Sequence, residues 1–431
     1  MIFRSVLFFA LMPNIGLGAL PSDTQPFAFL LACVGFMQMV QVNGSRASVI
    51  AVPFIFMAFL ASLSAAVAYI LQVHSSVDLL RYYYGYISAP IIVGYLVFKL
   101  PSVAPGVVVR VADAVLVVTA LGMVLQLVGL ASIINVVVNR SVYVDVTESA
   151  RGFTSFYSEQ SRVSIHMGIV AMIYVLEGSL TGRRLAVIAA LSFLSFAGQV
   201  GVVLSQLTLA ALASIVLYAL WHLSAKKKHL IVAAAASLSL ITLVLAAEPV
   251  LAVLASGGLP THGFNRALRV LELGGSYIAN DTGIIIKLSG LFQALSSLWE
   301  RPIVFALGAP ATEGYAESIS GTYANLSLFF MGHARLAFPD RLYSAFGTWI
   351  VDFGVIGLLS MLALHALILQ RIFREGRRVP IATLLAYVFW SMITMLQVAL
   401  ANPALWALLA VLWARAGADQ APGQDLPTTA R

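Results

Sequence analysis

Residues 151–162, RGFTSFYSEQSR, concentrate polar and charged groups in a chain of 431 residues that is only 10% charged. The stretch contains Arg151, Tyr157, Glu159 and Arg162 together with three serines. A planar guanidinium binds phosphate through two parallel hydrogen bonds, so paired arginines indicate an anionic substrate. The alternative is that arginines at helix ends only extend toward lipid phosphates.

Further candidates lie in the long segment 255–342. Arg266 and Arg269 are three residues apart, on one side of a predicted helix that stops at two glycines, 274–275. Residues 288–299 have apolar side chains at helical spacing, which predicts a second helix lying in the membrane interface. The alternative is an ordinary amphipathic connector. The other candidate residues of this segment are Arg301, His333 and Arg335.

Few ionisable residues are predicted inside the apolar segments, and among them Asp352 is the clearest case. Asp352 lies about nine residues into one of the segments, where a carboxylate costs about 2.5–3.5 kcal/mol on insertion scales. It is therefore expected to face a polar cavity, or else to hydrogen-bond a neighbouring helix. His166 follows Arg162 by one helical turn, and a lone histidine of this kind favours a packing or hydrogen-bonding role.

The composition predicts an all-α polytopic membrane protein. Hydrophobic residues make up 60% of the chain, and apolar runs of roughly 20 residues recur, each long enough to cross a ~30 Å hydrocarbon layer as a helix. The predicted spans are 2–19, 25–42, 48–72, 81–98, 107–130, 161–179, 185–199, 202–222, 230–254, 343–369, 379–399 and 402–415. The first also fits a cleaved signal peptide, which would leave eleven spans; an uncleaved span is favoured.

The lysines and arginines of the short loops predict the orientation. Arg46, Lys99, Arg110, Arg183 and Arg184, the lysines 226–228, Arg371 and Arg415 all fall on one side, which the positive-inside rule makes cytoplasmic. The predicted organisation is nine spans in 1–254 with an outward polar segment at 131–160, a large outer loop at 255–342, three spans in 343–415, and a disordered cytoplasmic tail at 416–431. Arg81 opens the fourth span from the outer side.

Several functional classes lack their motifs. There is no Walker A pattern, no HExxH, no GxSxG and no Cys/His ligand set, and Cys33 is the only cysteine. No cofactor and no metal site is predicted. The net charge of +7 is explained by the cytoplasmic loops, so no nucleic-acid partner is expected.

Three short stretches resemble the bacterial O-antigen polymerase and O-antigen ligase-like family of membrane proteins. RGFTSFYSEQSR is similar to the arginine–small–phenylalanine–acidic–serine segment that enters a middle span of that family. LWERPIVFALGAP, 298–310, resembles its stretch in which a proline after a helix leads to a glycine, and YSAFGTWIVDFGVIGLL, 343–359, resembles its span after the large periplasmic loop. The chain departs from the pattern at SEQS, where a proline often follows the acidic residue, and at ALGAP.

The resemblance implies a class-C glycosyltransferase fold with 11–12 spans and a large, partly helical periplasmic loop. It implies polymerisation of undecaprenyl pyrophosphate-linked oligosaccharide units at the periplasmic face of the bacterial inner membrane, without nucleotide sugar or metal. Arg151, Arg266, Arg269 and Arg301 are then expected to bind pyrophosphate, with Arg162, Arg335 and Tyr157 as further substrate contacts. Glu159 is expected to be the base or a sugar contact, His333 the second choice, and Asp352 the floor of the cavity. Membrane lipids, a chain-length regulator and a flippase are the expected partners.

Two other functions fit the same residues. An O-antigen ligase would share the fold and transfer finished glycan to lipid A–core. A lipid-linked oligosaccharide flippase or transporter belongs to a different class, and is expected to have internal repeats and charged residues along a path through the middle of the membrane. The polymerase is favoured because the candidate charges gather on the outer face and SFYSEQS fits it better.

Overall fold

A computed structural model of the chain describes residues 1–16, 25–42, 49–70, 76–104, 106–138, 153–157, 160–195, 294, 298, 344–373, 381–396 and 400–416. This part is helical, and its only β-type pairing is a single bridge between Ile15 and Val138. The helices are α1 (Ile2–Leu11), α2 (Pro26–Val42), α3 (Ala51–Ile70), α4 (Ser76–Lys99), α5 (Val107–Leu127), α6 (Ala131–Val137), α7 (Gln160–Leu176), α8 (Gly182–Ser195), α15 (Ala345–Ile372), α16 (Ile381–Leu396) and α17 (Pro403–Arg415). A 3₁₀ turn, Leu100–Ser102, follows α4.

Four helical segments of the described part are long and apolar enough to cross a membrane: Ala51–Ile70, Tyr83–Ser102, Val107–Leu127 and Ala345–Ile372. The prediction of an all-α protein with membrane-spanning helices agrees with these helices. The predicted spans 202–222 and 230–254 lie outside the described residues, and each of the other predicted spans overlaps a helix.

Helix α1 is shorter than the predicted span 2–19. It ends at Leu11 because Pro13 follows, and a proline disfavours helical geometry in the residue before it. Helix α4 begins at Ser76, five residues earlier than predicted. The short helix α6 lies in the segment 131–160 that was predicted only to be polar and outward.

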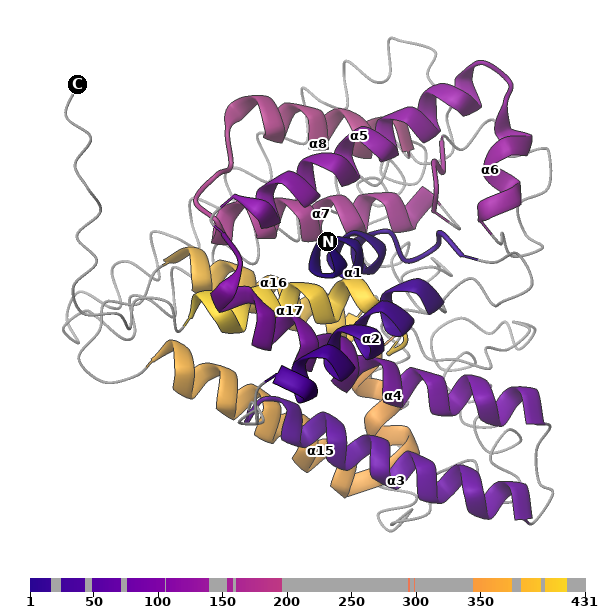
Figure 1. The fold of residues 1–431 in the computed structure, drawn as a ribbon, viewed down its shortest axis with the longest axis vertical. Coiled ribbons are helices and arrows are strands. Elements are labelled where there is room, and N and C mark those ends of the chain that lie inside the picture. Colours follow the sequence, from indigo (N-terminus) through magenta and orange to yellow (C-terminus); the bar gives the residue numbers. More distant parts are fainter. Residues whose placement is uncertain are drawn as a thin grey trace, which may run out of the picture.

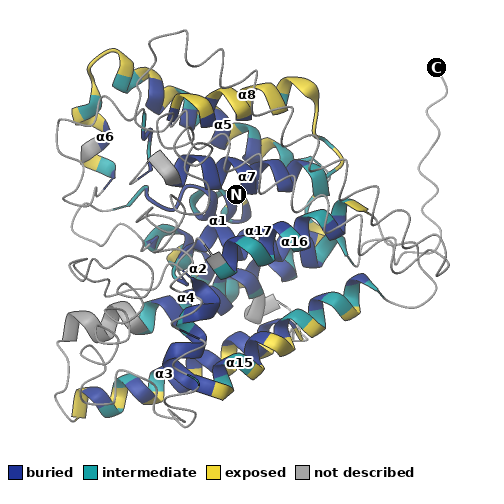
Figure 2. Ribbon diagram, turned by 180° about the vertical axis from the view of Figure 1, so that it is seen from behind, coloured by how far each residue is buried: buried dark blue, intermediate teal, exposed yellow. Residues whose placement is uncertain are grey.

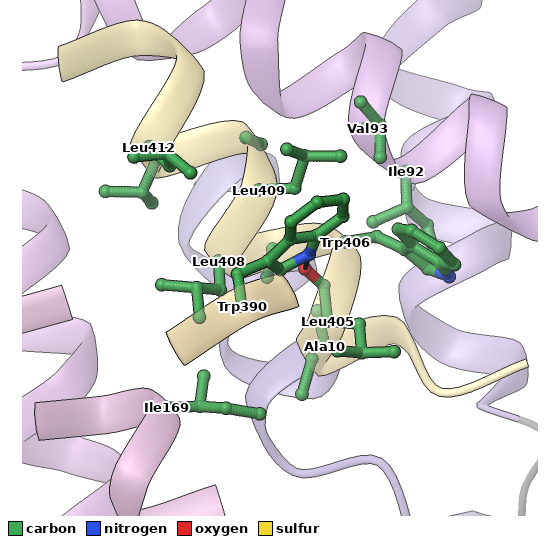
Figure 3. Close-up of a cluster of buried hydrophobic side chains, with 14 of the residues drawn as sticks. Ala10, Ile92, Val93, Ile169, Trp390, Leu405, Trp406, Leu408, Leu409 and Leu412 are labelled. Atoms are coloured by element: carbon green, nitrogen blue, oxygen red, sulfur yellow. Dashed lines mark hydrogen bonds between the residues drawn. The ribbon is translucent and has the colours of Figure 1, made fainter. Parts of the chain in front are cut away.

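Helix α17 is the centre of the bundle. Its residues Pro403–Trp413 are all buried, and it packs against α1, α4, α7 and α16 (Figure 1). Figure 3 shows its leucines and Trp406 surrounded by side chains of these helices, among them Trp390, whose indole N–H donates to the Leu405 carbonyl over 3.2 Å. A helix that is apolar on every side is stable only when neighbours cover all of it.

The outer helices expose apolar stripes instead. On α5 the exposed residues include Val117, Leu121 and Val124, which share one helical face. Helix α3 exposes Ile55 and Phe59 in the same way, and Figure 2 shows exposed residues along α3, α5, α8 and α15 around a buried interior. Such stripes fit a lipid environment, because lipid tails are as apolar as these side chains and exposure to them has no hydrophobic cost.

Candidate functional site

The segment 153–157, the described part of RGFTSFYSEQSR, is fixed to the bundle by polar contacts. Gln126 on α5 donates to the Thr154 hydroxyl over 2.8 Å and accepts from the Ser155 N–H over 2.7 Å. The Ser155 hydroxyl donates to the Thr119 carbonyl over 2.7 Å, and the Phe153 N–H donates to the Leu194 carbonyl of α8 over 3.1 Å. These bonds compensate a left-handed backbone at Ser155, with φ at 52°, which a serine adopts only when its surroundings fix it.

Gly122 on α5 permits this docking. A Cβ atom there would overlap the Ser155 hydroxyl and lie 2.8 Å from the Phe156 ring. A glycine is therefore needed for the segment to approach the helix so closely.

Tyr157 ends the segment in the core. It is fully buried, its hydroxyl donates to the Met12 sulfur over 3.2 Å, and its ring lies 4.9 Å from that of His166. Burial raises the pKa of this hydroxyl, so Tyr157 stays protonated. In this arrangement the side chain packs the interior, and its role as a substrate contact stays a prediction.

Arg162 and His166 occupy the first turns of α7, and both are buried, at 6% and 1% exposure. The His166 Nδ1 atom lies 2.6 Å from the Arg162 carbonyl, which can only accept, so Nδ1 carries the proton. Nε2 of the neutral ring then accepts from the Asn402 amide over 3.3 Å. Asn402 also caps α17 by accepting from the Ala404 N–H. Both nitrogens of His166 are thus used in structural bonds, as expected for a packing histidine.

Helix α15 is broken beside Asp352. Gly354 has φ 57° and ψ −131°, a backbone conformation that glycine adopts readily and other residues rarely do. Asp352 is 4% exposed, and the Tyr86 hydroxyl of α4 donates to its Oδ2 atom over 2.6 Å. The sequence-based alternative of a hydrogen bond to a neighbouring helix is therefore present, and the expected role of Asp352 as a cavity floor stays a prediction.

The two halves of α15, Ala345–Phe353 and Val355–Ile372, fold back on each other at Gly354; we call this break the elbow. The rings of Phe346 and His365 are 4.9 Å apart, although residues 19 apart in a straight helix are separated by about 28 Å. Near the break, a Cβ on Gly357 would overlap the Trp349 carbonyl. The span predicted at 343–369 is therefore not one straight helix.

Two ion pairs lie at the ends of α7, α8 and α17 that are away from the elbow. We call this end of the bundle the ion-paired end. Arg184 binds Asp113 through two bonds of 2.9 and 2.8 Å, and Tyr174 donates to the same carboxylate over 2.7 Å. Arg415 binds Glu177 through two bonds of 2.8 and 2.7 Å. Arg184 and Arg415, two of the described residues predicted to share one side, thus lie at one end of the bundle; Arg46 and the lysines 226–228 lie outside the described residues.

Asp352 and Arg162 both lie far from the ion-paired end. Arg371, at the end of α15, donates to the Trp413 carbonyl beside Arg415, and the elbow precedes Arg371 by 17 residues, or about 25 Å of helix. Arg162 precedes Glu177 by 15 residues, or about 22 Å of helix. The two buried charges therefore share the opposite half of the bundle.

Three predicted site residues, Tyr157, Arg162 and Asp352, are thus described. His166 contacts the Tyr157 ring and the main-chain carbonyl of Arg162, whereas Asp352 accepts a hydrogen bond from Tyr86 of α4. The other predicted residues lie outside the described part: Arg151, Glu159, Arg266, Arg269, Arg301, His333 and Arg335. Sequence reasoning missed Tyr86 and Asn402. A tyrosine in a span that also contains Arg81, and an asparagine directly before Pro403, were the available signals.

Among the described residues no three His, Cys, Asp or Glu side chains lie together as a metal site. No protein-family model, no curated protein and no solved structure matches the chain.

Proposed function

We propose that this protein is a polytopic glycosyltransferase of the bacterial inner membrane, which polymerises undecaprenyl pyrophosphate-linked oligosaccharide units at the periplasmic face. The observation that carries the proposal is the burial of Arg162 and Asp352 in the half of the bundle opposite the ion-paired end. Charged side chains inside a membrane bundle are costly, and they usually mark a substrate path.

The chemistry requires few groups. The acceptor hydroxyl attacks the anomeric carbon of the donor sugar, the bond from that carbon to the pyrophosphate oxygen breaks, and the electron pair leaves with the pyrophosphate. Guanidinium groups stabilise the charge that develops on the leaving group. A carboxylate, Glu159 in this proposal, takes the hydroxyl proton.

The docked segment supports the same proposal. Residues 153–157 lie in the sequence between the candidate residues Arg151 and Glu159, and they are held to α5 by hydrogen bonds and to α7 by the Tyr157–His166 ring contact. A fixed backbone next to candidate site residues is what a preorganised site needs.

One observation favours a second candidate, a lipid-linked oligosaccharide flippase. Many secondary transporters use broken helices at their substrate sites, and α15 is broken at Gly354 beside a buried carboxylate. We rank it second because no internal repeat is apparent in the sequence.

Deletion of the gene, followed by gel analysis of surface glycan and of carrier-linked intermediates, distinguishes the candidates. We expect surface glycan with a single repeat unit, because one unit can still be flipped and attached without a polymerase. Bare core with long carrier-linked polymer would identify a ligase. Single units trapped at the cytoplasmic leaflet would identify the flippase and refute the enzyme.

Complementation with point variants tests the carrying observation. Arg162→Ala is expected to abolish polymer with protein abundance near that of the wild type, and Arg162→Lys to restore it only partly because a point charge makes fewer bonds. Arg4→Ala, at an exposed arginine of α1, is the control and should leave glycan length unchanged. Full-length glycan from Arg162→Ala would remove Arg162 from the site.

A further inference from the structure

Two exposed arginines flank the Asp113–Arg184 ion pair. Arg110 precedes Asp113 by one turn of α5, and Arg183 is the residue before Arg184 on α8. Both bonds between Arg184 and Asp113 join α5 to the start of α8, so Arg110 and Arg183 lie on two helices that meet at one neutralised pair. Neither has a carboxylate partner in the described part of the chain.

The carboxylates near them are already bound. Asp113 is held by Arg184 and Tyr174, and Glu177 by Arg415. Within the described residues this end therefore has excess positive charge, and the exposed Arg110 and Arg183 contribute to it.

An apolar stripe begins directly at Arg110. Residues 110, 114, 117, 121 and 124 follow helical spacing along one face of α5, and all are exposed. The first is an arginine and the rest are Ala114, Val117, Leu121 and Val124. The start of α8 adds exposed Leu185 and Val187. A cationic end that continues into an apolar stripe is complementary to an anionic phospholipid, which has a charged head group and an apolar chain.

We propose that Arg110 and Arg183 bind the headgroup of an anionic phospholipid whose acyl chain lies along Val117, Leu121 and Val124. The charge of the end favours an anion, and the stripe favours a ligand with a hydrocarbon chain over free phosphate. Basic residues between helix ends at the cytoplasmic surface are suited to such lipids. The site lies on the exposed side of the ion-paired end, so it is separate from the buried charges of the proposed active site.

Native mass spectrometry of the purified full-length protein, titrated with phosphatidylglycerol, tests this site. Relative to the wild type, Arg110→Gln/Arg183→Gln should raise the half-saturating lipid concentration by about 25-fold, from about 1 kcal/mol for each guanidinium at an anionic surface. The control Arg4→Gln/Lys99→Gln removes the same charge from two other helices, α1 and α4, and should shift it less than twofold. Thermal melting checks that all variants fold.

Four outcomes would overturn the proposal, three of them from the lipid titrations and one from competition with phosphate. The first three are equal loss of binding in the control variant, wild-type binding by Arg110→Gln/Arg183→Gln, and equally tight binding of zwitterionic phosphatidylcholine. Inorganic phosphate that displaced the lipid at millimolar concentration would show that the site takes the anion alone, which also contradicts a lipid site. Raised salt should weaken the wild type and leave the double variant nearly unchanged, because the attraction is screened.

Discussion

Replacing Gly357 with alanine should destabilise the folded-back helix α15. The new Cβ would overlap the Trp349 carbonyl and lie 3.1 Å from the Ile350 nitrogen. These are backbone atoms, which cannot rotate away as a side chain can, so the two halves must separate. Overpacking of this kind costs about 1–3 kcal/mol, and alanine recovers at most about 1 kcal/mol of helix propensity. Because the overlap is with backbone atoms, the cost falls in the upper part of that range, about 2–3 kcal/mol, and the net loss is about 1–2 kcal/mol.

Gly85 on α4 offers a matched control. Its added Cβ would meet only the Leu400 and Ala401 side chains, at 3.8 and 3.9 Å, which is ordinary contact. Gly85→Ala should therefore keep or slightly raise the melting temperature in detergent, whereas Gly357→Ala should lower it. Equal melting temperatures for the two variants would refute the close packing of the halves.

A cross-link measures the same geometry directly. In a Cys33→Ala background, Phe346→Cys/His365→Cys should be joined by a short bismaleimide linker, since the native rings are 4.9 Å apart. A straight helix would separate these positions by about 28 Å and give no product. Absence of the cross-link in a folded variant would show that α15 is straight.

Two further predictions concern single bonds. Arg415→Gln should lower the free energy of unfolding by about 3 kcal/mol, because Glu177, with a side chain only 6% exposed, is left unpaired. Arg184→Gln should lower it by under about 1 kcal/mol, because Asp113 is 41% exposed and can be hydrated. Thermal melting compares the two variants, and equal losses of stability would contradict the argument from burial. Tyr86→Phe removes a hydrogen-bond donor to Asp352 and should lower polymer synthesis at least about tenfold, because a bond to a charged group is worth roughly 1.5–3 kcal/mol. The control Tyr95→Phe, on the same helix, should leave polymer synthesis unchanged. Unchanged glycan from both variants would exclude Asp352 from a role that depends on this bond.

The helices themselves were predictable because apolar runs of about 20 residues have few alternatives in a membrane. The end of α1 at Leu11 was also visible in principle, since Pro13 follows it. The predicted span 2–19 was too long because hydropathy outweighed that proline.

The elbow is harder to predict. Gly354 and Gly357 stand in an apolar run, and glycine in such a run fits a straight helix, a close contact or a break equally well. The three-dimensional structure distinguishes them, through the Gly354 dihedrals and the contact of Phe346 with His365. The partners of the buried polar groups were equally hidden, because Tyr86 and Asp352 are 266 residues apart in the sequence.

The elbow has a physical reason in the membrane itself. A straight α15 of 28 residues would be about 42 Å long, well beyond a hydrocarbon layer of ~30 Å. The second half alone is about 27 Å, which matches that layer, and it exposes Val355, Leu359 and Leu362 as a lipid-facing stripe.

The first half has a different surface, because nearly all of Ala345–Phe353 is buried. A segment that ends inside the membrane leaves backbone carbonyls unpaired at its end, and lipid cannot satisfy them. It is stable only when enclosed by protein, and here it lies against α16, where Phe346 meets Trp390. The break and Asp352 thus lie in a region enclosed by protein. A carboxylate buried beside a helix break is costly inside a membrane bundle, and this cost is consistent with the proposed substrate path.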